Sequence, residues 1–484
     1  MSGIFGAVSQ NNCSRTLLYG IDYHSHLGTE YGGMAVLGDN FQRQIHNISQ
    51  SQFKSKFFDD HQRIKGNKGI GVISDLDEQP IYLNSKFGPF CIVTAGLIEN
   101  KDELKEILFC KGISFSEVSP KGDINTTELI AKLISTGDNL VDGIERMFDM
   151  IQGSCSLLIL NKDGVYAARD QWGYTPLVVG RKKDEWVVAT ESSSLLNLGF
   201  EIAKLLAPSE IILLTPKGIE TRKKAADHMQ ICSFLWIYTG FPASSYEGIN
   251  VEEVREKCGK ALARKDNDID IDVVAGVPDS GIAHAIGYSI ESKKPYRRPL
   301  IKYTPGYGRS YTPPNQETRD LVARMKLIVI NSIIKGNSLA VLDDSIVRGT
   351  QFKNYTVKKL WNAQAKEIHI RPACPPLMFP CKFCLSTRSI DELAARKAIR
   401  ALEGKNIDDV SEYLDPSSEK YQKMIEWIKN DLNVTTLRYQ TIDDMVEAIG
   451  LPKEKLCLYC WTGDCPGEKA HRKQKEEDAT FSAK

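Results

Sequence analysis

Residues 339–351 read Leu339-Ala340-Val341-Leu342-Asp343-Asp344-Ser345-Ile346-Val347-Arg348-Gly349-Thr350-Gln351. The apolar run at the start is typical of a strand buried on both faces of a parallel sheet. Small and hydroxyl residues follow, and a helical pattern then continues with apolar residues at Phe352, Tyr355, Val357 and Leu360. The stretch therefore predicts a strand, a loop and a helix, and the backbone N–H groups at the start of the helix can bind an anion.

The two carboxylates at the end of the strand indicate what else this loop binds. Asp343 and Asp344 would repel a phosphate, whereas the paired hydroxyls of a ribose can donate hydrogen bonds to them. A phosphate loop beside a diol-binding pair indicates a sugar phosphate. The plainer alternative is a helix cap in a doubly wound fold. The loop Gly-x4-Gly-Lys-Ser/Thr is absent from the sequence, which argues against a nucleoside triphosphatase.

Length and composition limit the class of protein. The 484 residues predict two or three domains, and a formal net charge of 0 gives no basic excess for nucleic acid. No apolar stretch reaches membrane length and the first residues do not resemble a signal peptide, so we expect a cytoplasmic protein that binds no membrane. In that compartment, twelve cysteines favour core packing or metal ligation over disulfides.

The two halves of the chain show different patterns. Within residues 1–230, helical patterns alternate with short apolar runs at 69–73, 91–94, 154–160 and 185–189, which predicts a layered α+β domain. Helices are expected after Asn100 and after Asn125, which is an N-cap candidate with Glu128 three residues on. Residues 231–465 alternate strands and helices as an α/β domain does. The charged residues 466–484 are expected to be a disordered tail.

A second strand–loop–helix unit precedes the first one described. Residues 269–277 are apolar except for Asp270 and Asp272, and Pro278-Asp279-Ser280-Gly281 leads into a helical pattern. Taken alone, this unit is compatible with an ordinary turn. Between the two units, residues 302–316 are rich in Gly, Pro and Tyr, which predicts a mobile lid.

The stretch 339–351 strongly resembles the signature of type I phosphoribosyltransferases, and most closely that of the amidophosphoribosyltransferase family. The resemblance implies that Asp343 and Asp344 hold the ribose diol and, partly through the substrate, Mg²⁺. The lysine that begins the lid and further basic residues would bind pyrophosphate. The implied substrate-binding residues are Ser345, Ile346, Val347, Arg348, Gly349, Thr350, Asp279, Ser280, Gly281, Lys302, Arg309, Arg319 and Lys326.

The first half resembles the glutaminase domain of the same family, an N-terminal nucleophile hydrolase with an αββα sandwich fold. The matching scaffold segments are residues 3–6, 79–80, 152–156, 169–177 and 189–192. Family members have a nucleophilic cysteine at the N-terminus, and this chain has Ser2. A serine can also act as an N-terminal nucleophile with its own amine as base.

The segments that bind glutamine in the family are altered here. The family's His-Arg-Gly-Gln reads 26-His-Leu-Gly-Thr-29, and His-Val-Arg-Tyr, which clamps the glutamine carboxylate, reads 72-Val-Ile-Ser-Asp-75. The oxyanion segment His-Asn-Gly-Asn reads 94-Thr-Ala-Gly-Leu-97, and Thr126 replaces the aspartate that binds the substrate amine. Loss of one oxyanion donor alone costs about 10²–10³ in rate. We therefore expect a scaffold without glutaminase activity.

Cys457 and Cys460 form a Cys-x-x-Cys pair, which by itself is compatible with redox chemistry, zinc or core packing. Iron–sulfur members of the family combine such a pair with one cysteine at the domain junction and one after a proline. The resemblance thus implies a 4Fe-4S cluster on Cys232, Cys381, Cys457 and Cys460, with zinc as the alternative metal. Cys384 and Cys465 are further thiols nearby, and four unrelated buried thiols remain the plainest interpretation.

Together these resemblances imply an enzyme of the first step of de novo purine biosynthesis. It would form 5-phosphoribosylamine from phosphoribosyl pyrophosphate, with ammonia rather than glutamine as nitrogen donor. Two alternatives are a regulatory pseudoenzyme of purine metabolism and a phosphoribosyltransferase that uses another amine acceptor. The family also implies purine nucleotide effectors and a homotetramer or dimer.

Overall fold

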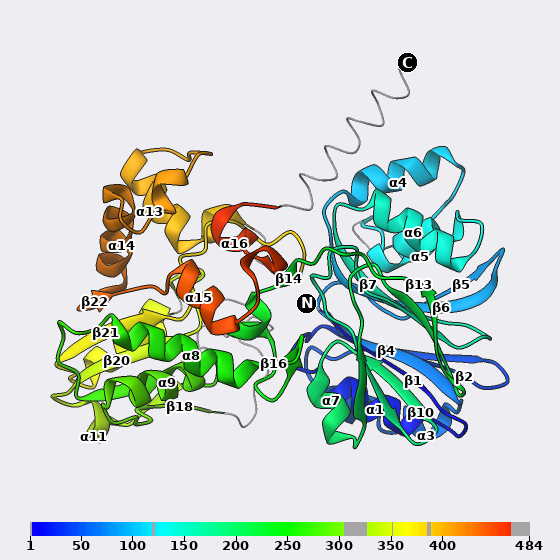
Figure 1. Cartoon of the computed structure of the whole chain (residues 1–484), viewed down its shortest axis with the longest axis horizontal. Helices are drawn as coiled ribbons and strands as arrows, with labels where there is room; N and C mark the ends of the chain where they lie inside the picture. Colours follow the sequence, from blue (N-terminus) through cyan, green and yellow to red (C-terminus); the bar gives the residue numbers. More distant parts are fainter. Residues whose placement is uncertain (1, 119–121, 304–326, 351, 385–388, 466–484) are drawn as a thin grey trace, which may run out of the picture.

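The computed structural model describes residues 2–118, 122–303, 327–350, 352–384 and 389–465. The chain forms two bodies side by side, and its N-terminus lies between them (Figure 1). The expected lid cations Arg309, Arg319 and Lys326, and the charged tail, lie outside the described residues. Within the described ranges, no helix is long and apolar enough to cross a membrane.

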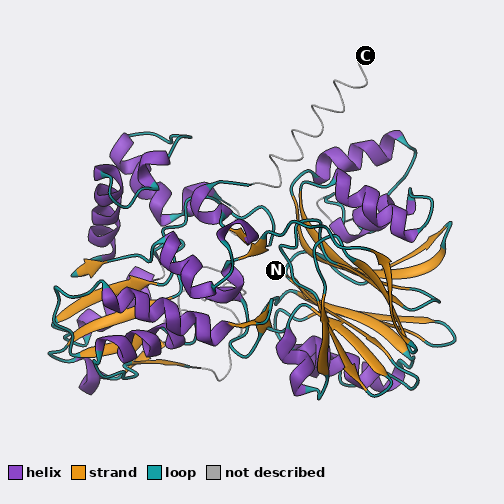
Figure 2. Cartoon of the chain, viewed as in Figure 1, coloured by secondary structure: helices purple, strands orange, loops and turns teal. Residues whose placement is uncertain are grey.

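The first body is built from two antiparallel sheets packed face to face. The strand orders are β11-β9-β10-β1-β4-β2-β3 and β13-β12-β8-β7-β6-β5. Helices α1, α2, α3 and α7 cover the first sheet, and α4, α5 and α6 cover the second (Figures 1 and 2). The bounds are β1 Ser2–Val8, α1 Ser14–Asp22, β2 Tyr31–Leu37, β3 Phe41–Asn47, α2 Phe53–Phe57, α3 Asp60–Arg63, β4 Lys68–Ser74, β5 Ile81–Ser85, β6 Gly88–Ile98, α4 Lys101–Cys110, α5 Thr126–Ser135, α6 Leu140–Met150, β7 Gly153–Leu160, β8 Val165–Ala168, β9 Val178–Lys182, β10 Glu185–Ala189, α7 Ser192–Asn197, β11 Glu201–Leu205, β12 Ile211–Thr215 and β13 Gly218–Lys223.

Strand β1 shows why these residues form a sandwich. Its residues are all buried, and successive side chains of a strand point to opposite faces. Ile4 and Val8 pack between the two sheets, whereas Phe5 and Ala7 pack against the α1 side. The four apolar runs expected as strands lie in β4, β6, β7 and β10. The predicted αββα sandwich is confirmed.

The two helices predicted after Asn100 and Asn125 are present as α4 and α5. Asn125 caps α5, because its side-chain oxygen accepts hydrogen bonds from Thr127 N and Glu128 N at 2.9 and 3.1 Å. The Glu128 carboxylate does not bond back to the cap. It accepts from the backbone N–H groups of Ser116 and Glu117 and so fixes the loop that precedes the helix.

The second body contains a parallel sheet in the order β17-β20-β21-β22. Ala340 and Leu342 of β20 pack against α8, α9 and α15, whereas Leu339 and Val341 pack against η2, α12, α13 and α14. The strand is therefore buried on both faces, as predicted. The bounds are β14 Ile231–Cys232, η1 Leu235–Thr239, β15 Ser245–Tyr246, β16 Ile249–Asn250, α8 Val251–Arg264, β17 Val273–Gly276, α9 Ile282–Ser292, β18 Leu300–Lys302, β19 Leu327–Val329, α11 Asn331–Ile334, β20 Ser338–Asp343, η2 Phe352–Val357, α12 Lys358–Asn362, β21 Glu367–Pro372, η3 Ile390–Glu392, α13 Ala394–Glu403, η4 Ser411–Tyr413, α14 Glu419–Leu432, β22 Thr436–Leu437, α15 Ile442–Ile449, η5 Lys453–Lys455, β23 Leu456–Cys457 and α16 Tyr459–Thr462.

Two elements of this body differ from the expectation. Strand β17 begins only at Val273, opposite Leu339 of β20. Asp272, just before it, donates its N–H to Ser338 O at 2.9 Å and accepts from Ser338 N through its side chain at 2.8 Å. The helix expected after Thr350 starts as the π-helical turn η2 and becomes α-helical only in α12. Val357 and Leu360 still face the core.

Candidate active site

Asp343 and Asp344 lie at the carboxyl end of β20, where both are buried. Parallel pairing of β17 with β20 brings the loop after β17 beside them. Ser280 Oγ donates a hydrogen bond to Asp343 Oδ1 at 3.3 Å, and the Ser345 hydroxyl donates to Asp344. The structure thus brings together the two strand–loop–helix units that the sequence singled out.

Burial shapes the electrostatics of this pair. Removal from water, followed by the negative charge of Asp344, raises the pKa of Asp343 well above its ordinary value. Burial also raises the pKa of Asp344, although hydrogen bonds from Ser280 and Ser345 oppose it. Full ionisation of the pair is therefore costly without a cation. A divalent cation such as Mg²⁺ would favour it, so the site fits that ion.

The raised pKa of Asp343 predicts a pH-dependent gain in stability for Asp343→Asn. A carboxyl with a raised folded-state pKa contributes stability at pH values below its unfolded pKa, and this stability is lost as the pH rises through the folded-state pKa. Asparagine cannot ionise. We expect the melting temperature of the variant to exceed that of the wild type most at alkaline pH, and the difference to shrink toward pH 4. A pH-independent difference in thermal unfolding would contradict the assignment.

The loop after the carboxylates is held by its own residues. Ile346 is buried in the core, and Val347 O accepts a hydrogen bond from Ala394 N at 2.8 Å. Gly349 has a φ of 75°, in the left-handed region that favours glycine. Arg348 forms an exposed ion pair with Glu392 at 2.7 Å. Ile346 and Val347 therefore anchor the loop, and Ser345 and the backbone around exposed Thr350 remain for a ligand.

Lys302, which the sequence predicted to bind pyrophosphate, lies beside the loop Asp279-Ser280-Gly281. Asp279 follows a cis peptide bond, and its carboxylate pairs with Lys302 Nζ at 2.6 Å. Lys302 is the last residue of β18, and the described residues stop one position later, at Tyr303. An anion that displaced the Asp279 carboxylate would contact the Lys302 ammonium at the edge of this loop.

Arg255 is a residue of this site that sequence reasoning missed. Its Nε donates to Trp236 O at 2.9 Å, and its Nη2 donates to Tyr238 O and Gly240 O at 3.0 and 2.9 Å. Its positive charge lowers the pKa of Asp344 against the larger effect of burial. The sequence signal for Arg255 was its position on the buried face of the amphipathic helix α8, one turn after Val251.

Ser2 is the first residue of β1, and only 2% of its surface is exposed. Its hydroxyl is 2.9 Å from that of Ser74, which accepts a hydrogen bond from Leu76 N at 3.0 Å. Ser74 stands where the family has its clamping arginine, and the adjacent Asp75 accepts from Thr29 N at 2.6 Å. Ser2 bonds to Ser74 and Thr29 to Asp75, and none of these side chains carries a positive charge that could bind a substrate carboxylate.

A cavity of about 580 Å³ adjoins Ser2 and is lined by both bodies. Burial raises the pKa of Asp77 in its wall, against hydrogen bonds from the N–H and hydroxyl of Thr126. Thr126, at the position of the family's amine-binding aspartate, is thus occupied within the protein. The second body contributes Pro380, Cys381, Lys382 and Cys384.

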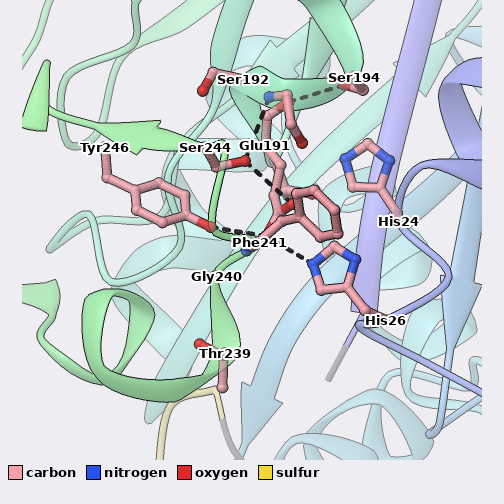
Figure 3. A network of polar contacts seen from close by, with 12 residues as sticks. His24, His26, Glu191, Ser192, Ser194, Thr239, Gly240, Phe241, Ser244 and Tyr246 are labelled. Atoms are coloured by element: carbon pink, nitrogen blue, oxygen red, sulfur yellow. Dashed lines mark hydrogen bonds and ion pairs between the residues drawn. The ribbon is translucent and has the colours of Figure 1, made fainter. Parts of the chain in front are cut away.

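Glu191 joins the two bodies through a buried carboxylate (Figure 3). It accepts hydrogen bonds from His26 Nε2 at 2.9 Å, Tyr246 Oη at 2.8 Å and Phe241 N at 3.1 Å, and from Ser244 Oγ at 3.3 Å. Burial alone would raise the pKa of Glu191, but the His26 ring and its other partners outweigh burial and lower it. His26, in a segment that differs from the family's glutamine site, therefore helps to hold the domain junction.

Of the eight cysteines in one buried core cluster of the second body, six interact with one another and form a layer near β14 and α16, whose ribbons are labelled in Figure 1. Parallel pairing of β14 with β23 sets Cys232 beside Cys457, and the Cys460 thiol hydrogen-bonds with Cys381. The layer consists of Cys232, Cys381, Cys384, Cys457, Cys460 and Cys465. As the side chains lie in the described ranges, no three His, Cys, Asp or Glu residues converge on a single metal position.

The surroundings of these thiols favour their protonated form. Burial raises the pKa of Cys457 well above its ordinary value, and a hydrogen bond with Cys381, then burial, does the same for Cys460. Thiols in such surroundings become thiolates only when metal cations bind them. The Sγ of Cys381 accepts from Phe383 N and Cys384 N, both at 3.4 Å, as ligand sulfurs of iron–sulfur sites do.

Comparisons with known proteins agree with this architecture. A family described as "Glutamine amidotransferase domain" matches residues 64–197. The amidophosphoribosyltransferase of Methanocaldococcus jannaschii is 31% identical, over 97% of this chain and 98% of its own. The solved glutamine phosphoribosylpyrophosphate amidotransferase of Bacillus subtilis, complexed with ADP and GMP, is 28% identical with a TM-score of 0.81, covering 96% of this chain and 97% of that one. A structure described as the allosteric regulatory enzyme of purine biosynthesis gives 27% identity, a TM-score of 0.81 and 96% coverage of both chains.

The fold and its carboxylate loop define a phosphoribosyltransferase, a type of glycosyltransferase, joined to an N-terminal nucleophile hydrolase-like domain. The similarity extends over almost the whole length of chain and relatives. The chain belongs to the amidophosphoribosyltransferase family.

Proposed function

We propose that this protein forms 5-phosphoribosylamine from phosphoribosyl pyrophosphate with ammonia, rather than glutamine, as the nitrogen donor. The reaction would be the first step of de novo purine biosynthesis. One contrast supports the proposal: the Asp343–Asp344 pair stands assembled with both of its loops, whereas Ser74 occupies the place of the glutamine clamp.

The two loops of the second body and the residues beside them have separate roles in this reaction. Asp343 and Asp344 accept hydrogen bonds from the two ribose hydroxyls, and the loop Ser345–Thr350 binds the phosphate through its backbone N–H groups. The loop Asp279–Gly281 and Lys302 bind the pyrophosphate, and Mg²⁺, when bound, neutralises it. The bond between C1 and the pyrophosphate oxygen breaks, the lone pair of ammonia forms the C1–N bond, and the new amine releases one proton to solvent.

The carboxylate pair also contributes to catalysis through its charge. Cleavage of the C1–O bond builds positive charge on the ribose ring, and two carboxylates at the edge of the sheet are placed to stabilise it. Arg309 and Lys326 in the lid would add cations for the leaving pyrophosphate. A closed lid would also keep water from competing with ammonia for C1.

Four further features are part of the proposal. We divide the chain into residues 1–230, 231–465 and a disordered tail, 466–484. We expect purine nucleotides as effectors, since the related Bacillus subtilis protein was solved with ADP and GMP. A homotetramer or dimer and a cytoplasmic location remain predictions from the sequence.

We propose a 4Fe-4S cluster on Cys232, Cys381, Cys457 and Cys460, with zinc as the alternative metal. The support is the single buried layer of thiols and the two N–H groups that donate to Cys381 Sγ. The cluster would be structural. It would tie β23 and α16 back to the domain junction and supply no electrons to the reaction.

Two other functions are distinguishable by assay. A regulatory pseudoenzyme would bind phosphoribosyl pyrophosphate or purine nucleotides without releasing pyrophosphate. An enzyme for another amine would release pyrophosphate faster with that amine than with ammonium chloride. The buried, ionisable pair at Asp343 and Asp344 favours catalysis. Burying two adjacent carboxyl groups costs folding free energy, and a protein that served only as a scaffold would not need such a pair.

The nitrogen source predicts the behaviour of Ser2→Ala. Wild-type protein should release no glutamate from glutamine. The variant should retain the ammonia-dependent rate within about twofold, because Ser2 belongs to the first body and the Asp343–Asp344 pair to the second. Pyrophosphate and glutamate release are measured on the same preparation. Strong glutamate release that disappears in Ser2→Ala would make Ser2 an active nucleophile and refute the proposal.

A further inference from the structure

The cavity of about 580 Å³ that both bodies line lies at an edge of β6 that β5 leaves uncovered. Strand β5 pairs with residues 88–92 of β6, and β7 pairs with the opposite edge over residues 91–98. Gln79 occupies the next position along the uncovered edge, because its side-chain oxygen accepts from Thr94 N at 2.8 Å. Backbone groups that point to one side of a strand recur every second residue. The N–H and carbonyl of Gly96 therefore face the cavity, which Gly96 lines.

Two serine side chains line the same cavity from between the two sheets. Ile4 of β1 and Leu158 of β7 pack between the sheets, and strand alternation gives Ser2 and Ser154 the same directions as these two residues. The Ser2 hydroxyl lies 2.9 Å from that of Ser74. Ser154 is 1% exposed, and its hydroxyl has no hydrogen-bond partner within the described part of the chain. A buried hydroxyl without a partner costs free energy, which a polar ligand in this cavity would recover.

Asp77 supplies the half-buried negative charge of this cavity. The exposed charges of the lining, which solvent screens, are Glu99, Lys101 and Asp123. Lys382 is half-buried as well, but its Nζ lies over the Tyr459 ring, 5.4 Å from the ring centroid. Charges interact more strongly where water is excluded, so the Asp77 carboxylate has the larger effect on a ligand inside the cavity. It favours an ammonium group and repels a carboxylate.

We propose that this cavity binds a small primary amine that carries an amide and no carboxylate. The ammonium pairs with the Asp77 carboxylate, and the amide, which has a donor and an acceptor, bonds to the Gly96 backbone as a neighbouring strand would. Ser154 gains a partner from the same ligand. Both bodies line the cavity, so the ligand stabilises their contact. The inference rests on the proposed loss of glutamine use, and it adds a ligand site apart from Asp343 and Asp344.

Four probes test this ligand class by calorimetric titration of the full-length protein without phosphoribosyl pyrophosphate. They are 4-aminobutanamide, which is glutamine without its carboxylate, 4-carbamoylbutanoate, which is glutamine without its amine, glutamine itself, and butylammonium, which has no amide. We expect 4-aminobutanamide to bind most tightly and to raise the melting temperature, because a ligand of the folded state stabilises it. Butylammonium should bind about fivefold more weakly, through loss of the amide hydrogen bonds. Glutamine and 4-carbamoylbutanoate should bind at least about tenfold more weakly.

Three variants place the bound amine in the cavity. Asp77→Asn keeps the size of the side chain and should weaken 4-aminobutanamide binding about tenfold or more, and Ser154→Ala should weaken it about fivefold. Asp102→Asn is the matched control, since this exposed carboxylate on α4 contacts Lys105 Nζ at 3.3 Å and should leave the affinity unchanged.

Three results would overturn the inference. They are affinity unchanged in both Asp77→Asn and Ser154→Ala, equal or tighter binding of 4-carbamoylbutanoate or butylammonium, and no binding of 4-aminobutanamide. In each case, ammonia-dependent pyrophosphate release that stays intact would leave the proposed function standing. Tighter binding of glutamine, accompanied by glutamate release, would refute the inference and the proposed nitrogen source together.

Discussion

Replacement of Asp343 and Asp344 together by asparagine should abolish phosphoribosyl transfer. The two carboxylates accept the ribose hydroxyls and face the positive charge that develops on the ring, so their loss removes binding and catalysis at once. A single preorganised polar contact to a transition state is worth about 10²–10³ in rate, and we expect a loss of at least about 10³ for the pair. The measurement is pyrophosphate release from phosphoribosyl pyrophosphate with ammonium chloride.

The fold should survive this double substitution. Asparagine side chains keep the acceptors used by Asp344 N and by the Ser280 hydroxyl, and burial no longer opposes an ionised group. Asp270→Asn is the control, because this carboxylate pairs with Lys294 at the surface, before β17 begins. Near-normal pyrophosphate release from the double variant would show that the transferase site lies elsewhere.

Replacement of Cys457 by serine should remove the cluster and destabilise the protein. Anaerobically purified wild type should be brown and carry about four irons per chain, and the variant should be colourless. Thiolate ligation contributes directly to folding, so we expect a clear drop in melting temperature. A loss of about 3 kcal/mol lowers the melting temperature of a domain of 150–250 residues by roughly 6–12 °C.

Cys110→Ser is the control for this change, since Cys110 is exposed on the first body, at the end of α4. It should leave both colour and melting temperature unchanged. A colourless wild type with one zinc per chain would replace the cluster by the alternative metal. A wild type with neither metal would assign the six cysteines to core packing.

The sequence predicted the fold where a local pattern determines the structure. Strand β20 was recognisable because residues buried on both faces of a parallel sheet give a continuous apolar run. The Asn125 cap was recognisable because its contacts lie within three residues. The π-helical start of η2 was not, since a helical spacing of apolar residues does not distinguish a π-turn from an α-turn.

The candidate site was predictable only in part for the same reason. Asp343 and Ser280 each follow a strand, so the pairing of adjacent strands could bring them together. The contacts of Arg255 and Glu191 depend on segments remote in sequence: the Arg255 guanidinium caps the carbonyls of residues 236–240, and Glu191 meets residues 241–246.

The origin of the product nitrogen tests the central claim most directly. The protein is supplied with phosphoribosyl pyrophosphate, ¹⁵N-labelled ammonium chloride and unlabelled glutamine, and the isotope in the phosphoribosylamine product is determined by mass spectrometry after trapping. The account predicts that the product nitrogen is ¹⁵N and that no glutamate forms. Product that carries unlabelled nitrogen, with glutamate released in equal amount, would contradict it.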